Sequence, residues 1–194
     1  TLVGSGVANA DGVWTVTTGT LAAGVHNLTA TATDAAGNVG PASAALAVTI
    51  DTVSTTPSAL DLVTASDSGI LITDNLTNVT TPTIAGKAEA NATVSLFDGT
   101  VLVGTALADA GGNWQITVAT PLKDGSHSLT AQATDLAGNV SVKSAALTVR
   151  IDATAQAAPT GLDLTTDSGV SATDNITNSA TPTITGSAEA GITV

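Results

Sequence analysis

Cysteine, methionine and tyrosine are absent from this 194-residue chain, and other aromatic residues are scarce. Without cysteine the chain has no disulfide and no thiolate metal site. The aromatic residues are Trp14, Phe97 and Trp114, which is few for a specific ligand pocket. Packing therefore falls to Ala, Val, Leu, Ile and Thr, and the abundance of Val and Thr favours strands over helices.

Basic residues are also scarce. Against 16 acidic residues stand only Lys87, Lys123, Lys143 and Arg150, which gives a net charge of −12. This balance argues against binding to nucleic acid or to an anionic membrane surface. No apolar run approaches the length of a membrane span, so we expect no direct membrane insertion. A signal-peptide pattern is missing as well, and we interpret the chain as an internal piece of a longer polypeptide.

What the chain does contain is an internal repeat with a period of about 100 residues. The segment LVGSGVANADGVWTV (2–16) returns as LVGTALADAGGNWQI (102–116), so Trp14 matches Trp114. ATDAAGN (32–38) returns as ATDLAGN (133–139), DSGILITDNLTN (67–78) as DSGVSATDNITN (167–178), and TPTIAGKAEANATV (81–94) as TPTITGSAEAGITV (181–194). A unit of this length is a whole small domain and is far longer than a solenoid repeat. Such arrays more often provide reach or multivalency than catalysis.

Alternation and turn residues predict seven short strands in the one complete unit. The expected strands are 59–64, 82–86, 92–97, 101–108, 114–118, 126–134 and 140–150, with a long polar loop at 65–80 and a hairpin turn at Asp98-Gly99. Seven strands in about 100 residues predict an all-β fold, an antiparallel Greek-key β-sandwich of the Ig-like type. Both Trp14 and Trp114 are expected to fill the cores of their domains.

The repeat divides the chain into three parts. We expect residues 51–150 to form a complete Ig-like repeat, 1–50 the C-terminal part of a preceding one, and 151–194 the N-terminal part of a following one. The expected partners are therefore neighbouring repeats of the same polypeptide. A second hypothesis is head-to-tail complementation, in which the end of one copy completes the start of another. That complemented unit would lack only the equivalent of residues 95–100.

Acidic residues fall in the turns, and strand alternation assigns the turns to two poles of the sandwich. Asp51, the turn of Glu89 and the loop from Asp135 to Asn139 share the N-terminal pole. Two carboxylates about 5 Å apart repel by roughly 3 kcal/mol at an effective dielectric near 20. Ca²⁺ relieves such repulsion and accepts carboxylate, amide and backbone oxygens. We therefore predict a calcium site from Asp51 and Asp135, with Glu89 and Asn139 as further ligands.

A second calcium site is expected in the loop that contains Asp67 and Asp74, together with Asp152 from the next linker. Asp167 and Asp174 match this loop in the following repeat, and Asp34 matches Asp135 in the preceding one. The alternative is that these Asp and Asn side chains only form Asx-turns and cap strand ends.

The combined motifs ATDLAGNVS (133–141), DSGxxxxDNxTN (67–78 and 167–178) and TPTIxGxAEANATV (81–94) resemble the bacterial Ig-like repeats of giant type I-secreted adhesins and biofilm-associated (Bap-like) proteins. The resemblance covers essentially the whole chain. It implies a secreted, cell-surface stalk for cell adhesion or biofilm formation, with junctions between domains stiffened by calcium.

Three functional alternatives stay open. The first is this non-enzymatic stalk, and the second is a binding module whose repeats self-associate or bind glycans. The third is an accessory domain of a secreted hydrolase. A triad of Asp124, Ser126 and His127 is not expected, because these residues adjoin in sequence and triads are assembled by geometry from distant segments.

Overall fold

The computed structural model describes residues 1–194 and is all β, with no helix that could cross a membrane. It comprises two compact units, residues 1–151 and 152–194. The first unit contains a two-stranded ribbon of β1 (Gly24–Leu28) and β2 (Leu46–Ile50), followed by the strands of the complete repeat. The second unit contains the antiparallel pair β11 (Thr160–Leu164) and β12 (Ile184–Ser187).

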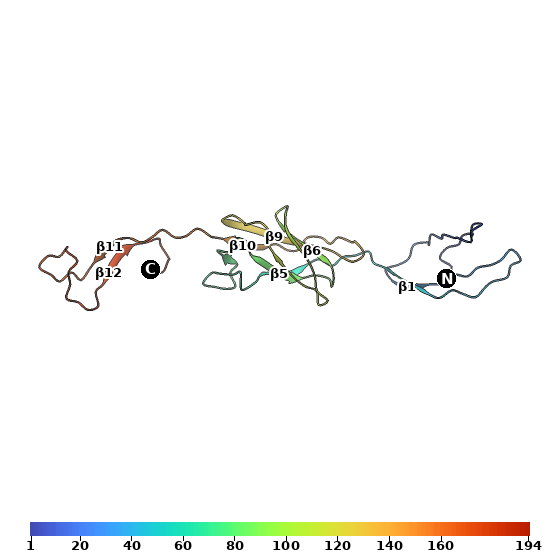
Figure 1. The fold of residues 1–194 in the computed structure, drawn as a ribbon, viewed down its shortest axis with the longest axis horizontal. Helices are drawn as coiled ribbons and strands as arrows, with labels where there is room; N and C mark the ends of the chain where they lie inside the picture. Colours follow the sequence, from blue (N-terminus) through green and yellow to red (C-terminus); the bar gives the residue numbers. More distant parts are fainter. The chain divides into compact units, whose positions relative to one another are not determined.

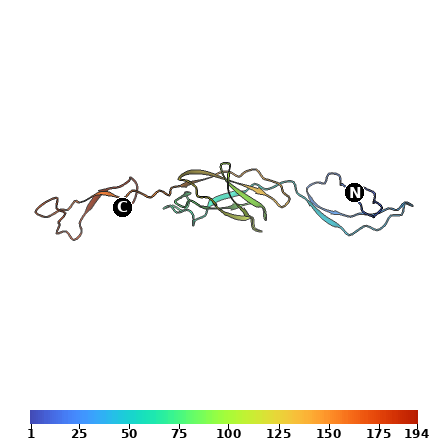
Figure 2. The same ribbon diagram turned by 45° about the horizontal axis from the view of Figure 1, so that its top comes forward.

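The complete repeat is a sandwich of two sheets. A three-stranded sheet has the order β3-β5-β8, and a five-stranded sheet has the order β4-β10-β9-β6-β7. Figure 1 shows β5 in one layer and β6, β9 and β10 in the other, and Figure 2 shows the same layers turned by 45°. The bounds are β3 Ser58–Leu62, β4 Leu76–Thr77, β5 Thr83–Lys87, β6 Thr93–Asp98, β7 Val101–Leu107, β8 Asn113–Thr117, β9 Gly125–Thr134 and β10 Leu147–Ile151. The predicted all-β, Ig-like sandwich is confirmed.

Strand alternation places the core between the sheets, because successive side chains point to opposite faces. On β9, Leu129, Ala131 and Ala133 are fully buried while the side chains between them are only partly buried. On β10, Val149 and Ile151 are buried in the same core. The alternation of apolar and polar residues along both strands in the sequence predicts this inward face. The core also contains Ile84, Val94, Leu96, Trp114, Ile116 and Val118.

Two glycines allow the sheets to approach or turn. Gly99 has φ +58° at the hairpin between β6 and β7, as the Asp98-Gly99 pair predicts. Gly86 lies opposite Trp114 in the β5–β8 pairing. A Cβ at Gly86 would be 2.4 Å from the Trp114 ring, so the ring packs directly on the bare backbone of β5.

The structure corrects three sequence expectations. The strand expected at 140–150 is regular only over 147–151. Before it, Ser141 and Ser144 bond the backbone of β9 through their hydroxyls as well as their amides, so this segment is irregular. The loop 65–80 includes the short strand β4, which pairs parallel with β10. Trp14 is 56% exposed rather than buried, whereas Trp114 is 2% exposed. Residues 1–50 contain no counterpart of β5 for the Trp14 ring to pack on.

Candidate metal centre

Three acids that are far apart in sequence meet at one end of the complete sandwich. Asp51 lies just after β2, Glu89 follows β5, and Asp135 follows β9. Carboxylate oxygens of all three lie within 4.8 Å of one another. No other group of three or more His, Asp or Glu side chains in residues 1–194 is close enough to share an ion. The sequence predicts this association, because strand alternation brings these three turns to one pole.

Hydrogen bonds fix the carboxylate of Asp135 in place. The backbone amide of Asn139 donates to its Oδ1 at 2.8 Å, and the Asn139 side-chain amide donates to its Oδ2 at 2.8 Å. The hydrogen bond from the Asn139 side chain has the largest effect and lowers the pKa of Asp135. Desolvation opposes it, but the bonds from backbone amides add to the lowering, so the pKa lies below its usual value. Asp135 is therefore ionised at neutral pH.

The linker that enters the repeat is tied to the same acids. The Asn139 side-chain amide also donates to the backbone carbonyl of Asp51 at 3.1 Å. The backbone amide of Thr55 donates to a Glu89 carboxylate oxygen at 3.3 Å. Asn139 and Glu89 thus connect the linker to two loops of the sandwich. Because the side-chain nitrogen of Asn139 donates these bonds, only its amide oxygen could bind a cation.

The donor set fits calcium. Ca²⁺ binds oxygens at 2.3–2.6 Å, so two ligands of one ion are at most about 5 Å apart. The 4.8 Å spread of the three carboxylates meets that limit. None of the three forms an ion pair with Lys or Arg, so their negative charges face one another without a neutralising cation from the protein.

Asx-turns, the alternative to metal binding, are present in the loops that begin at Asp34 and Asp109. Asp34 Oδ1 accepts the backbone amides of Ala36 and Asn38 at 2.9 Å, and Asp109 Oδ1 accepts those of Gly111 and Asn113 at 2.8 Å. In both loops the side-chain amide four residues on donates to the carboxylate. That bond is the main cause that lowers the pKa of each acid. The loop of Asp34 therefore has the hydrogen bonds of the Asp135 loop, and turn formation and metal binding are compatible uses of one carboxylate.

The Asp67–Asp74 loop is built differently. Asp67 is 3% exposed, and its Oδ1 has no hydrogen-bond partner. Asp74 Oδ1 accepts the backbone amide of Leu76 at 3.1 Å. Ser68 exchanges hydrogen bonds with Asn78, and Thr77 Oγ1 donates to the carbonyl of Ser66 at 2.5 Å. A buried carboxylate oxygen without a partner is costly unless something satisfies it.

The same loop recurs in the second unit with the same unpaired oxygen. Ser168 bonds Asn178, and Thr177 Oγ1 donates to the carbonyl of Thr166 at 2.7 Å. The Asn175 amide donates to Asp167 Oδ2 at 3.1 Å, and Asp167 Oδ1 is again buried without a partner. Asp174 accepts the amide of Ile176. Asp152 also belongs to this second unit.

One polar pair was missed by the sequence analysis. His127 Nδ1 lies 2.7 Å from Asp98 Oδ2, and His127 Nε2 lies 2.9 Å from the carbonyl oxygen of Lys123. Desolvation of the ring acts most strongly and lowers its pKa, but the bonds to Lys123 and Asp98 outweigh it and raise the pKa of His127 overall. The pairing follows from the register of β6 and β9, which places Asp98 opposite Leu129, and no local motif signals it.

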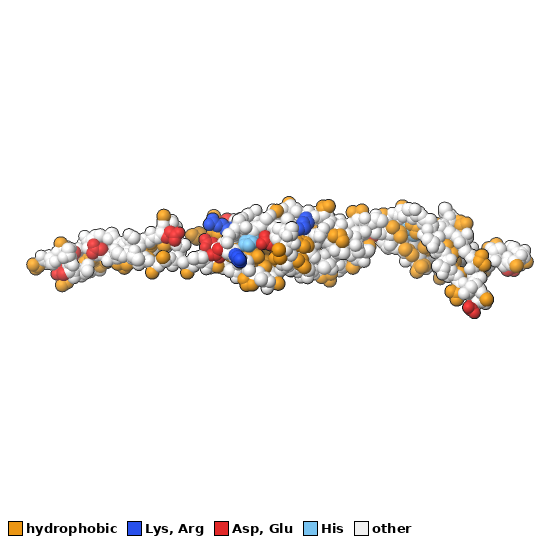
Figure 3. Space-filling view, turned by 90° about the horizontal axis from the view of Figure 1, so that it is seen from above, with side chains coloured by type: hydrophobic (Ala, Val, Ile, Leu, Met, Phe, Trp, Pro, Cys, Tyr) orange, Lys and Arg blue, Asp and Glu red, His pale blue; other side chains and the backbone are white.

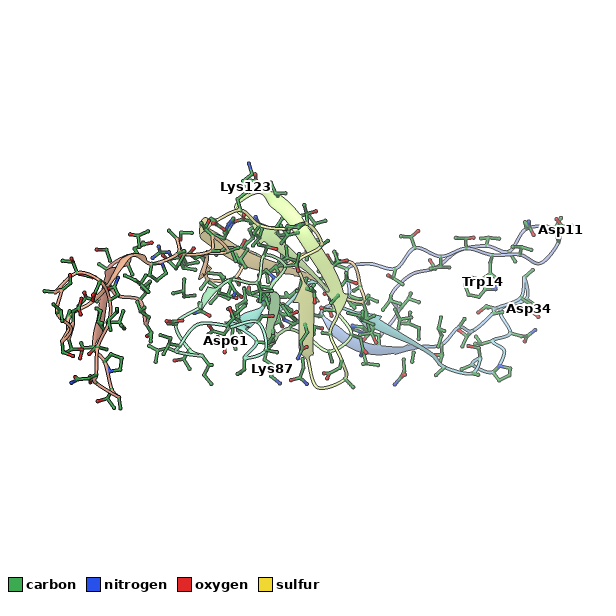
Figure 4. All side chains as sticks on the ribbon, turned by 60° about the vertical axis from the view of Figure 1, so that its left-hand side comes forward. Asp11, Trp14, Asp34, Asp61, Lys87 and Lys123 are labelled. Atoms are coloured by element: carbon green, nitrogen blue, oxygen red, sulfur yellow. The ribbon has the colours of Figure 1, made fainter.

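Charged side chains are few on the visible face in Figure 3 and lie in small groups, while hydrophobic side chains form scattered patches among polar side chains and backbone. In Figure 4, Lys87 and Asp61 project from the complete repeat, and Asp34 and Asp11 lie on the loops of residues 1–50.

The match to a family model agrees with the fold. The family model of the bacterial Ig-like domain matches residues 1–52 and 54–153. A comparison with curated proteins finds no match. Among solved structures, the chain is similar to one described as "Biofilm associated protein - BSP domain", with 21% identity and a TM-score of 0.35. That similarity covers 79% of this chain and 23% of the other, so this chain spans less than a quarter of that structure's length.

Proposed function

This chain belongs to the bacterial Ig-like domain family, and we propose that it is a non-enzymatic stalk segment of an extracellular, cell-surface adhesin of the kind that mediates biofilm formation. Its mechanical role is to link sandwiches in tandem, so that a distal binding module is held away from the cell. A strand of ten residues spans about 33 Å, so each repeat adds a few nanometres of reach.

We further propose that Ca²⁺ stiffens the entry to the repeat by binding Asp51, Glu89 and Asp135. The observation that carries this proposal is the convergence of the three carboxylates within 4.8 Å without a basic partner. Asp51 belongs to the linker, whereas Glu89 and Asp135 belong to the sandwich. A cation held by all three would therefore join the linker to the domain and restrict bending, while Asn139 positions both Asp135 and the Asp51 backbone.

A second calcium site in the Asp67–Asp74 loop is part of the same proposal. The unpaired, buried oxygen of Asp67 supports it, and so does the unpaired oxygen of Asp167 at the matching position. Fewer than three acids gather in either loop, so a bound ion would rely on backbone carbonyls and water for its remaining ligands.

The test is a thermal melt of the whole chain, followed by circular dichroism, in EDTA and then in 10 mM CaCl₂ or MgCl₂. Extracellular calcium modules bind with dissociation constants of about 0.1–1 mM. Ten millimolar Ca²⁺ would then stabilise the folded repeat by about 1.4–2.7 kcal/mol. For a domain of this size that is a rise in melting temperature of roughly 5–20 °C. An unchanged midpoint in CaCl₂, or an equal rise in MgCl₂, would contradict the calcium proposal.

A second candidate function is adhesion between repeats, and one feature of the complete repeat favours it. The edge strand β7 bears no charged side chain, and Val101, Leu102 and Leu107 on it are all more than half exposed. Uncharged apolar edges are prone to pair with other chains. Calcium-dependent self-association in light scattering would favour adhesive repeats over a passive stalk.

A further inference from the structure

The complete repeat is held differently at its entry and at its exit. In a tandem array, a pull along the chain enters this repeat through Asp51 and leaves it through Asp152. β3 is the first strand after the entry, and β10 is the last strand before the exit. These two strands belong to different sheets and share no ladder of backbone bonds. The pull is therefore passed from β3 to its only neighbour in the sheet, β5, before it reaches the rest of the sandwich.

The entry strand β3 is weakly attached. Its ladder with β5 has three pairs and shifts register between Ser58 and Asp61. Within this shift Ala59 has φ +52°, a left-handed conformation that residues with a Cβ rarely adopt. Only the last residue of the strand, Leu62, is buried, and Leu60 is half-buried. β3 thus combines an interrupted ladder, a strained residue and a small buried surface.

No strand pairs with the outer edge of β3, which lies at the end of its sheet. A groove lined by residues 57–60 and 144–147 lies beside it instead. The linker before β3 is held by single bonds that involve one side chain each. The Ser54 hydroxyl donates to the Ala133 carbonyl oxygen at 3.4 Å, and the bonds of Glu89 and Asn139 to the linker are described above. Detaching the linker and β3 therefore breaks few bonds and leaves β5 paired with β8.

The exit strand β10 is attached on both sides. It pairs with β9 over five consecutive residues without a register shift, and it pairs parallel with β4. The Arg150 amide donates to the Asn75 carbonyl oxygen at 2.9 Å, and Val149 and Ile151 are buried in the core. Because ladder bonds are perpendicular to the strands, a pull along a strand loads all of its bonds together. The strand with the fewer bonds, β3, is therefore the first to detach.

We propose, on the basis of the stalk function proposed above, that tension detaches β3 before the rest of the repeat unfolds. Residues 52–62 leave the sandwich in this first step, while β5 to β10 stay folded. The core supports such an intermediate, because Leu62 and the half-buried Leu60 are its only members from β3. The step is reversible, since the remaining sheets keep the place of β3 open.

The cluster of Asp51, Glu89 and Asp135 lies where it would change the path of the force. Asp51 precedes β3, whereas Glu89 follows β5 and Asp135 follows β9. A cation held by all three would connect the linker to the ends of β5 and β9 and would bypass β3. Under the calcium proposal, detachment of β3 then requires a larger force in Ca²⁺ than in EDTA.

The experiment is constant-force stretching of the whole chain between its two ends in optical tweezers, first in EDTA. β3 already runs from one pole of the sandwich to the other, so its release lengthens the chain by only on the order of 1 nm. We expect this short, reversible step at a lower force than the main unfolding step of the repeat. Residues 1–50 and 152–194 add the same extension in every variant below.

A disulfide lock identifies the strand that is released. The chain has no cysteine, so the double substitution Asp61→Cys and Ala85→Cys places the only two thiols opposite each other on β3 and β5. Oxidation should remove the short step, and reduction of the same variant should restore it. The matched control is Ser95→Cys with Thr105→Cys, which locks β6 to β7 and should keep the short step.

Unfolding of the repeat in a single step in EDTA would overturn the proposal, and so would a short step that persists in the oxidised β3–β5 lock. The calcium proposal is tested separately by adding CaCl₂ to the unlocked chain, which should move the short step to higher force. A short step that the lock removes but CaCl₂ does not move would leave β3 as the first strand to detach and would contradict the calcium site alone.

Discussion

Replacing Asp51 by asparagine should change the stability of the repeat in opposite directions with and without calcium. The three carboxylates lie within 4.8 Å of one another. At that distance a pair of unit charges repels by about 3.5 kcal/mol at a dielectric of 20 and by about 0.9 kcal/mol at 80. Asp51 is exposed, so the lower figure applies to its two pairs, and salt reduces it further. We expect Asp51→Asn to stabilise the metal-free repeat by about 1 kcal/mol, or roughly 4–8 °C.

We expect the sign to reverse in calcium, because under the calcium proposal the variant loses a charged ligand of the ion. The substitution keeps the side-chain oxygen that accepts the Val53 amide at 3.2 Å, so the local turn is preserved. Thermal melts of wild type and Asp51→Asn in EDTA and in 10 mM CaCl₂ measure both effects. Asp61→Asn is the matched control, since Asp61 lies on β3 outside the cluster. A variant that is destabilised equally in both solutions would refute the reasoning, because Asp51 would then act only as a turn former.

Three further predictions concern the complete repeat. Leu129→Ala removes a fully buried side chain between the sheets and should cost about 2.7–5 kcal/mol in urea unfolding; a loss below about 1 kcal/mol would contradict the described core. Ala59 has φ +52°, whereas the matching Gly161 has φ +62°. Because glycine adopts a left-handed φ at less cost than alanine, Ala59→Gly should raise the unfolding free energy by up to about 1 kcal/mol. A lower unfolding free energy would show that the left-handed φ of Ala59 is not a source of strain. The raised pKa of His127 adds stability that is present below pH about 6.5 and is lost as the pH rises through the folded-state pKa. His127→Gln should therefore flatten the pH dependence of the melting temperature between pH 6 and 8, and a variant with the wild-type slope would contradict this role of the Asp98 and Lys123 bonds.

The sequence is sufficient to predict the sandwich and its inward faces, because alternation along a strand is local information. It also predicts the meeting of Asp51, Glu89 and Asp135, since counting strand reversals assigns each turn to a pole. The contacts between the loops and the linker cannot be predicted in this way. Asn139 bonds both Asp135 and the Asp51 backbone. This arrangement depends on how the linker enters the domain, and no spacing in the sequence indicates it.

Two outcomes depended on long-range packing and could not be read from a motif. The Asp98–His127 pair joins residues 29 positions apart through the β6–β9 register. Trp14 and Trp114 occupy matching positions of the repeat but differ in exposure. The difference arises because a tryptophan on β8 is buried by β5, which is contributed by residues some 30 positions earlier. Burial of a strand residue is thus a property of the sheet that receives it.

The same dependence explains why the acidic loops can serve two purposes. Asp34, Asp109 and Asp135 all close Asx-turns with an asparagine four residues on, and in each the bonds lower the pKa of the acid. Each turn is therefore stabilised while its acid is ionised, and this contribution is lost as the pH falls through the lowered folded-state pKa. Only Asp135 also has two acids from other segments beside it. The turn thus fixes an ionised carboxylate wherever the motif occurs, and the surrounding fold decides whether that carboxylate faces others, as the proposed calcium site requires.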